Sequence, residues 1–237
     1  MKKVILYFSC VLSLVLFTNC STKYIKFKKP DNEIYPSSNL KNFLATNKNP
    51  KVVLRTPYTN FNVTESEKSS LSKNDYNYLY DAIEKELLKQ GFVVRDRQLF
   101  NQVVSNKDNN VDYSKLKDKT DTDLIIELSK LDTELLYETN KYYTQKNDEK
   151  KLNYLYKRYG AVVEFKIILM NNNEFAGTYT YNYTPCSNEK PCEINSDFEK
   201  RWKKIQKGKE PDENVEKNQL EIFIRDATKQ LVESMRK

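Results

Sequence analysis

The sequence offers few residues for catalysis or metal binding, and its four cysteines are the most informative of them. The chain has 237 residues, with no histidine and only four glycines. The lack of histidine excludes a Ser-His-Asp triad, a Cys-His pair and any histidine-ligated zinc or haem. No glycine-rich phosphate loop of the GxGxxG or GxxxxGK[ST] type occurs. The chemistry that remains belongs to cysteine thiols, carboxylate pairs and serine-lysine pairs.

Two of the cysteines, Cys186 and Cys192, lie close together in the last quarter of the chain. In an oxidising compartment such a pair most simply forms a disulfide, whose short closed loop adds about 2 kcal/mol before strain. A metal site is poorly served by two thiols without histidine or a second pair. A redox centre needs a lowered thiol pKa, which nothing nearby indicates. We expect a structural disulfide, no metal and no cofactor.

Two other patterns are the candidates for enzymatic chemistry. Asp121 and Asp123 lie on one side of an expected strand start and allow a weak cation site, although acids more often simply flank a strand. Ser129 and Lys130 are adjacent but have no catalytic motif around them. We therefore expect a protein that is not an enzyme, with a hydrolase independent of histidine as the enzymatic alternative.

The N-terminus has the pattern of an export signal. Lys2 and Lys3 precede an uncharged run from Val4 to Phe17, which is too short for a comfortable membrane span. Cys10 lies inside this run. Such a segment is typical of a secreted or membrane-attached bacterial protein.

The end of the run, Leu16-Phe17-Thr18-Asn19-Cys20, resembles a bacterial lipoprotein box. In such a box the cysteine is lipidated and becomes the first residue of the mature chain. Phe17 and Asn19 stand where other residues are commoner. The resemblance implies a signal peptide over residues 1–19 and lipidation (palmitate among the acyl chains) of Cys20. An uncleaved anchor helix and a cleaved signal without lipid are the alternatives.

The next segment, residues 20–50, is polar, with three prolines and only scattered apolar residues. It cannot be expected to bury enough apolar surface to offset the entropy lost on ordering, so we predict a flexible tether. The lysines near its start are either solvated or in contact with anionic lipid headgroups, worth up to about 1 kcal/mol each. This cluster consists of Lys23, Lys26, Lys28 and Lys29.

Residues 51–237 are predicted to form one α+β globular domain. A buried strand is expected at 51–56, a loop at 58–70, and a helix starting at Ser72 that ends at Gly91 as its left-handed cap. The inward face of that helix is Tyr76, Leu79, Tyr80, Ile83 and Leu87. Further elements are a strand at 92–94, short helices at 98–104 and from Asp112, a strand from Asp123 towards Tyr143, and a charged loop at 145–153.

The clearest periodicity lies in residues 161–184. Alternating apolar residues from Ala161 to Leu169, the turn Asn171-Asn172-Asn173 and a tyrosine-rich return strand predict an antiparallel hairpin. A charged helical stretch is expected at 198–205, and a last helix from Asn214 carries the apolar stripe Leu220, Phe223, Ile224, Ala227, Leu231 and Met235. This order indicates a single mixed, largely antiparallel sheet with helices packed on it.

The stretch from Ile83 to Val104 resembles a pattern of bacterial envelope lipoproteins. Its helix, Gly91-Phe92-Val93-Val94, Arg97 and short helix, followed by Asp123-Leu124-Ile125-Ile126, is similar to the TolB amino-terminal domain, the curli-secretion lipoprotein and the penicillin-binding-protein activator lipoproteins. The similarity covers roughly residues 51–185 and the last helix. The cysteine loop departs from the pattern. The resemblance implies a non-enzymatic protein of the cell envelope. Surface-exposed lipoproteins often carry acids just after the lipidated cysteine, whereas this chain carries Lys23 to Lys29, so we expect it on the periplasmic side of the outer membrane.

The expected function is therefore a lipid-anchored lipoprotein that is held at the membrane and binds an envelope protein or peptidoglycan. The chain has 17 tyrosines, many of them in the strand region. A recognition face that includes Tyr142, Tyr143, Tyr179 and Tyr181 is one interpretation, and the high strand propensity of tyrosine is the other.

The sequence disfavours two other classes of function. An oligomeric outer-membrane export pore requires alternating strands of about nine to eleven residues that face lipid, and the one such hairpin is needed for the core. Binding to nucleic acid is not expected, because the basic residues are scattered among 33 acids although the isoelectric point is about 9.0.

Overall fold

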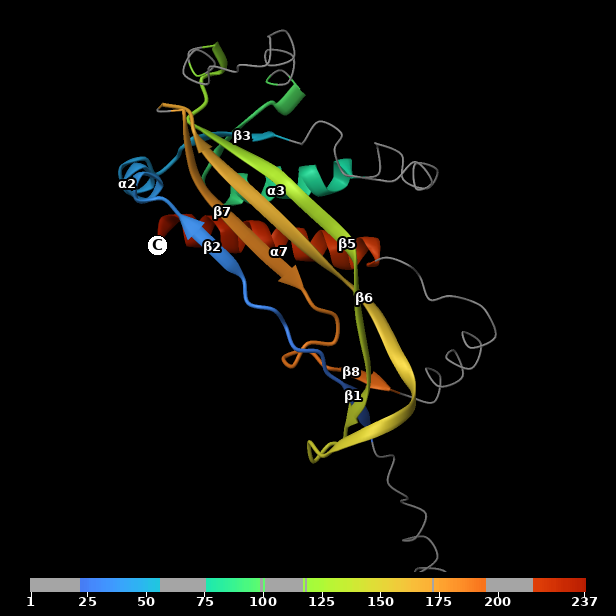
Figure 1. Ribbon diagram of the computed structural model, residues 1–237. Coiled ribbons are helices and arrows are strands. Elements are labelled where there is room, and N and C mark those ends of the chain that lie inside the picture. Colours follow the sequence, from blue (N-terminus) through green and yellow to red (C-terminus); the bar gives the residue numbers. More distant parts are fainter. Residues whose placement is uncertain are drawn as a thin grey trace, which may run out of the picture. The chain divides into compact units, whose positions relative to one another are not determined.

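Figure 1 shows the computed structural model of the protein. It describes residues 22–55, 76–98, 100, 117, 119–171, 173–194 and 215–237. The chain divides into two compact units. The smaller unit contains, among described residues, 22–27, 138–156 and 186–194, and the larger unit contains the rest.

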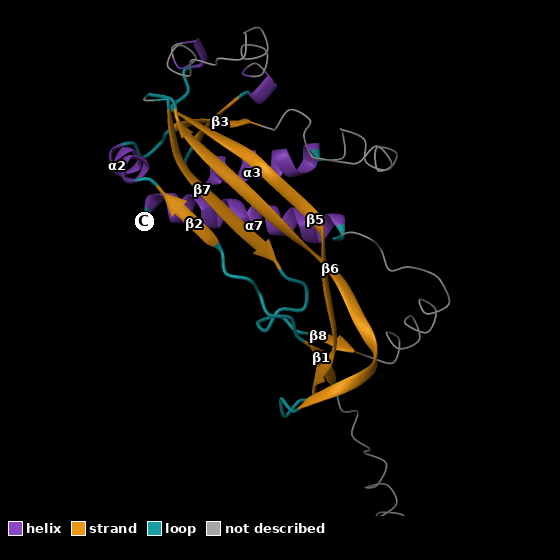
Figure 2. Cartoon of the chain, in the orientation of Figure 1, coloured by secondary structure: helices purple, strands orange, loops and turns teal. Residues whose placement is uncertain are grey.

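The strands belong to one eight-stranded sheet with the order β2-β7-β6-β5-β1-β8, with β3 and β4 added beside β5. Figure 2 shows these strands with the helices α2, α3 and α7. Pairing is antiparallel except for β3, which is parallel to both β4 and β5. The predicted α+β class, with a mixed, mostly antiparallel sheet and helices, is thus confirmed.

The larger unit is organised around the buried strand β3 (Lys51–Arg55), which lies between β4 (Val93–Arg95) and β5 (Leu124–Tyr143). Val52 and Leu54 face one side of the sheet and join the main core, whereas Val53 faces the other side. Both sides are therefore covered, as expected for parallel strands. The second, smaller cluster consists of Val53, Phe100, Ile125 and Met170.

Helices α3 (Asn77–Lys89) and α7 (Lys217–Arg236) cover the main core and pack against each other. Every residue of the predicted α7 stripe is buried, which confirms that stripe. On α3 the predicted Leu79, Ile83 and Leu87 are buried. Glu86 of the same helix is only 8% exposed, and its carboxylate accepts a hydrogen bond from the Gln90 side chain at 2.9 Å. Gly91 has a φ of +85°, as its predicted capping role requires.

The predicted hairpin is formed by β6 (Glu149–Leu169) and β7 (Glu174–Tyr183). A β-bulge lies where Ile167 and Ile168 pair with Gly177 and Phe175. The bulge places Ala176 in the core and leaves Phe175 58% exposed.

The prediction that residues 20–50 are a flexible tether is wrong for residues 22–50. This segment contains β1 (Lys23–Ile25), β2 (Glu33–Pro36) and α2 (Ser38–Thr46). β2 pairs with β7, and Leu40 and Leu44 of α2 enter the main core. A few well-placed apolar side chains on regular elements bury enough surface, because the sheet and α7 supply the rest of their surroundings. The structure therefore places no domain boundary at residue 51.

The predicted charged loop at 145–153 is also too long. The connection between β5 and β6 is a tight turn at 144–148, in which the Thr144 amide donates to the Asp148 carbonyl at 3.0 Å. The strand resumes at Glu149. Exposed lysines are tolerated there because both faces of this part of the strand are largely accessible.

Several predictions lie outside the described residues. These are the signal peptide and Cys20, the loop at 58–70, the helix start at Ser72, and the helical stretches from Asp112 and at 198–205. In the part of the chain that the structure describes, no helix has the length and hydrophobicity needed to span a membrane.

Candidate functional site

The predicted disulfide between Cys186 and Cys192 is present. Cys192 belongs to β8 (Cys192–Ile194), where it pairs with Ile25 of β1. Cys186 is 5% exposed, and the Tyr156 hydroxyl lies 3.7 Å from its sulfur. The bond therefore connects an edge strand to a buried part of the smaller unit, which is a structural role.

The four candidate tyrosines do not form one surface. Tyr179 and Tyr181 are buried in the main core, at 0% and 1% exposure, so the prediction that they belong to a recognition face is wrong. Burial raises the pKa of Tyr181 to about 12 and raises the pKa of Tyr179 further. High strand propensity and packing explain both residues.

Tyr142 and Tyr143, in contrast, are half-exposed and lie at the end of β5 in the smaller unit. The ammonium group of a lysine from the N-terminal segment lies over each of the two rings. Lys23 Nζ is 5.6 Å from the Tyr142 ring centre, and Lys26 Nζ is 4.9 Å from the Tyr143 ring centre. Such cation–π contacts stabilise by about 0.5–1 kcal/mol each at exposed sites.

The adjoining end of the β5–β6 hairpin, residues 141–151, is here called the hairpin tip. Lys26 Nζ donates to Asn147 Oδ1 at 2.6 Å, and Gln145 Nε2 donates to Thr22 Oγ1 at 3.2 Å. Lys141 pairs with Glu149 at 2.8 Å. The first described residues are therefore bonded directly to the hairpin tip.

The acids Asp121 and Asp123 have cationic partners from the chain itself. Lys51 Nζ lies 2.5 Å from an Asp121 oxygen, and Arg95 binds the other oxygen and the Asp121 carbonyl. The Lys51 amide donates to Asp123 Oδ2 at 2.9 Å. The hydrogen bond from Lys51, with help from Arg95, lowers the pKa of Asp121.

These contacts connect the start of β3 and the end of β4 to the residues that lead into β5, and these three strands are parallel. A structural role therefore accounts for the i, i+2 spacing of the two acids. Across the described ranges, no group of three or more histidine, cysteine, aspartate or glutamate side chains is placed to hold a metal ion.

Ser129 and Lys130 do not form a catalytic pair in this arrangement. The Ser129 hydroxyl donates to Glu164 Oε1 at 2.5 Å, across to β6. Lys130 is the next residue of the same strand, so its side chain points to the opposite face.

Arg97, one of the residues that carries the family resemblance, has a packing role. Its guanidinium lies 5.1 Å from the Tyr80 ring centre and pairs with Asp81 at 3.4 Å and with Glu84 at 3.6 Å. Burial raises the pKa of Glu84, and the charge of Arg97 partly opposes this. The arginine thus holds the segment after β4 against α3.

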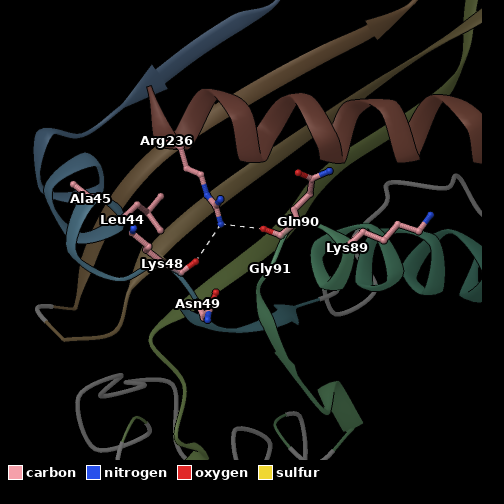
Figure 3. A pocket seen from close by; sticks show the side chains of 8 residues that line it. All are labelled: Leu44, Ala45, Lys48, Asn49, Lys89, Gln90, Gly91 and Arg236. Atoms are coloured by element: carbon pink, nitrogen blue, oxygen red, sulfur yellow. Dashed lines mark hydrogen bonds between the residues drawn. The ribbon is translucent and has the colours of Figure 1, made fainter.

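Sequence reasoning did not anticipate a pocket of about 510 Å³ in the larger unit. Figure 3 shows it between α2, the end of α3 and the end of α7. Arg236 donates to the carbonyl oxygens of Lys48 at 3.3 Å and Gln90 at 3.0 Å, and its guanidinium lies over Phe92 at 5.2 Å. The lining residues are Leu44, Ala45, Lys48, Asn49, Lys89, Gln90, Gly91 and Arg236.

The cationic residues of this pocket are Lys48, Lys89 and Arg236, and none of its lining residues is an acid. Lys89 pairs with Glu86 at 3.7 Å, so the excess of positive charge comes from Lys48 and Arg236 and favours a negatively charged group. The sequence contains one signal of this pocket, Gly91, whose positive φ ends α3 beside the Asn49 side chain. The contribution of α2 cannot be seen in a segment predicted to be a tether.

Comparison with known proteins adds little. No protein-family model and no curated protein matches the sequence. A crystal structure of a PDZ domain protein from Parabacteroides distasonis aligns over 85% of this chain and 40% of that chain. The TM-score is 0.28 and the sequence identity is 13%. This chain thus spans 40% of the length of that protein.

Proposed function

We propose that the protein is a lipid-anchored, non-catalytic lipoprotein of the bacterial cell envelope, held on the periplasmic side of the outer membrane through Cys20. The observation that carries the proposal is the N-terminal sequence: two lysines, an uncharged run and then Cys20. Acyl chains at this residue give durable attachment, because each buried methylene adds about 0.8 kcal/mol.

The disulfide is a second, independent support. Disulfides form and persist in oxidising compartments such as the periplasm and are rare in the bacterial cytosol. With Cys186 bonded to Cys192, Cys10 inside the proposed signal peptide and Cys20 directly after it, each of the four cysteines has a place that fits an exported protein.

Metabolic labelling with palmitate tests the anchor. We expect label and membrane association in the wild-type protein, and the loss of both in Cys20→Ser. The matched control is Cys10→Ser, which leaves the proposed lipidation site intact and should keep the label. Equal labelling of wild type and Cys20→Ser would contradict the proposal.

For the globular part, we propose that the pocket beside Arg236 binds an acidic group of an envelope protein or of peptidoglycan. The supporting observations are its concave shape and its three cationic residues without an acid. In cells, crosslinking to a partner should fall in the Lys48→Glu/Lys89→Glu variant. It should persist in Lys130→Glu/Lys229→Glu, which changes the net charge equally at exposed residues that are more than one helical turn from the residues lining the pocket.

The mass of the detergent-extracted protein distinguishes our proposal from the export-pore alternative. Protein extracted in mild detergent is expected to be monomeric under our proposal, whereas a pore subunit would remain a stable ring. The hydrolase alternative finds no support in the partners of Ser129 and Asp121, both of which are bonded within the sheet.

A further inference from the structure

The proposed lipid attachment site and the first strand are separated by very little chain. Thr22 is the first described residue, and β1 begins at Lys23. Since a residue spans at most about 3.6 Å, the Cα of Cys20 lies within about 8 Å of the Cα of Thr22. A lipid on Cys20 would therefore sit against the folded protein, in contrast to the thirty-residue spacer that the sequence suggested.

The hairpin tip lies beside Thr22 and the start of β1. Tyr24 pairs with Tyr143, and the Gln145 side chain donates to Thr22 Oγ1 at 3.2 Å. Lys26 reaches Asn147 in the turn. The residues next to the anchor are thus bonded to both ends of the turn that joins β5 to β6.

The chemistry of the tip suits a lipid surface. It carries four lysines, Lys141, Lys146, Lys150 and Lys151, against the acids Asp148 and Glu149, and Lys23 and Lys26 lie beside it. Residues 145–151 are all exposed. Tyr142 and Tyr143 are half-exposed aromatic residues of the kind enriched at membrane–water interfaces.

We infer that the hairpin tip is a second membrane contact, which lies on anionic headgroups of the leaflet that holds the lipid anchor. The inference rests on the proposed lipidation of Cys20. The short connection from Cys20 brings the tip to the surface, and its excess of lysines is complementary to anionic lipid. The consequence is a fixed orientation, in which β6 leads away from the membrane.

A series of labelled positions along β6 tests this orientation. Lys146→Cys, Lys151→Cys and Leu155→Cys each place a fluorophore at an exposed site of the smaller unit, and positions 151 and 155 are about 13 Å apart along the strand. The full-length lipidated proteins are reconstituted in vesicles of phosphatidylethanolamine and phosphatidylglycerol that carry a headgroup quencher. We expect strong quenching at 146, less at 151 and the least at 155.

A charge-reversal variant tests the role of the lysines. Lys146→Glu/Lys150→Glu/Lys151→Glu, read with the fluorophore at Leu155→Cys, should lose the dependence of quenching on phosphatidylglycerol. Lys41→Glu/Lys85→Glu/Lys229→Glu changes the net charge equally at exposed sites of the larger unit and should keep it. Circular dichroism of each variant checks that it is folded.

The outcomes separate the two proposals. The mass of the N-terminal peptide from the same samples reports whether Cys20 is acylated. A peptide without acyl chains overturns the proposed lipid anchor itself. An acylated protein with equal quenching at the three positions, or with the strongest quenching at 155, overturns the membrane contact of the tip and leaves the anchor standing.

Discussion

At the scale of single residues, one hydroxyl group in the core of the larger unit is buried at an energetic cost. Tyr179 is fully buried, and its hydroxyl has no hydrogen-bond partner in the described part of the chain. A buried hydroxyl without a partner costs about 1–3 kcal/mol in desolvation. Tyr137 is the opposite case, because its hydroxyl lies 3.2 Å from Thr184 Oγ1.

We predict that Tyr179→Phe raises the free energy of unfolding by about 1 kcal/mol, since it removes the unpaired group and keeps the ring. The same change at Tyr137 should lower it by about 1 kcal/mol, because a formed hydrogen bond is lost. Urea denaturation of both variants measures the two signs. A destabilised Tyr179→Phe protein would show that the hydroxyl has a partner.

Asp121 makes stability depend on acid pH. Its pKa is lowered in the folded protein by Lys51 and Arg95, so its contribution is complete above the unfolded pKa, about 3.9, and is lost as the pH falls through the lower folded pKa. Asp121→Asn keeps a residue that tolerates the local φ of 49°. We expect the wild type to be more stable than Asp121→Asn at pH 7, with the difference shrinking below pH 4.

The measurement is chemical denaturation of both proteins across this range, with Asp226→Asn as the variant that removes an exposed carboxylate from α7. A difference between wild type and Asp121→Asn that stays constant down to pH 2 would contradict the assigned ion pairs.

At the scale of elements, α2 decides whether the N-terminal segment is part of the fold. Leu40 is fully buried in the main core, and its backbone amide donates to the capping Ser37 hydroxyl at 3.2 Å. We predict that Leu40→Ala lowers the free energy of unfolding by about 3 kcal/mol, through lost burial and the cavity left behind. The neighbouring exposed Lys41→Ala should change it by less than about 0.5 kcal/mol. A flexible tether would make both changes neutral.

The same elements mark how far the sequence could predict the fold. The β6–β7 hairpin and α7 were predictable because their apolar residues recur with clear periods. β1, β2 and α2 were not, since each is a short element with few apolar residues, and Ile25, Leu40 and Leu44 pack on partners that lie far along the chain. A pattern within one segment carries no information about a surface that another segment supplies.

The candidate site divides in the same way. The disulfide was predictable because its two cysteines are near neighbours in the sequence. Tyr179 and Tyr181 were predicted to share one side of a strand, which is correct, but only the packing of the sheet shows that this side is the core. The pocket and the hairpin tip each combine segments that are distant in sequence, so residue spacing could not reveal them.

At the scale of the whole molecule, the two units differ in what holds them. Among the described residues, the main core and the cluster around Val53 belong to the larger unit, whereas the smaller unit contains the disulfide and buried side chains such as Ile25, Phe27 and Tyr156. A region with less buried apolar surface opens at lower free energy. The crosslink therefore matters most for the smaller unit.

We predict that Cys186→Ser/Cys192→Ser accelerates amide hydrogen exchange in β1 and β8 by about thirtyfold, the equivalent of about 2 kcal/mol. Exchange in α3 and α7 should remain close to the wild-type rate. Wild-type protein treated with a reductant is the control and should match the variant. Equal acceleration in both units would mean that the crosslink stabilises the whole protein.

The pairing of β2 with β7 has a further consequence for how the protein is made. A chain that emerges with its N-terminus first produces β2 and α2 well before β7 and α7, on which they pack. The contact of Asn32 with Gln230, at 3.2 Å, joins residues that are 198 positions apart in the sequence. Pairings between distant segments form slowly. The larger unit therefore cannot complete its sheet until β7 has been made, and until then the new chain displays an unpaired strand that a chaperone can hold.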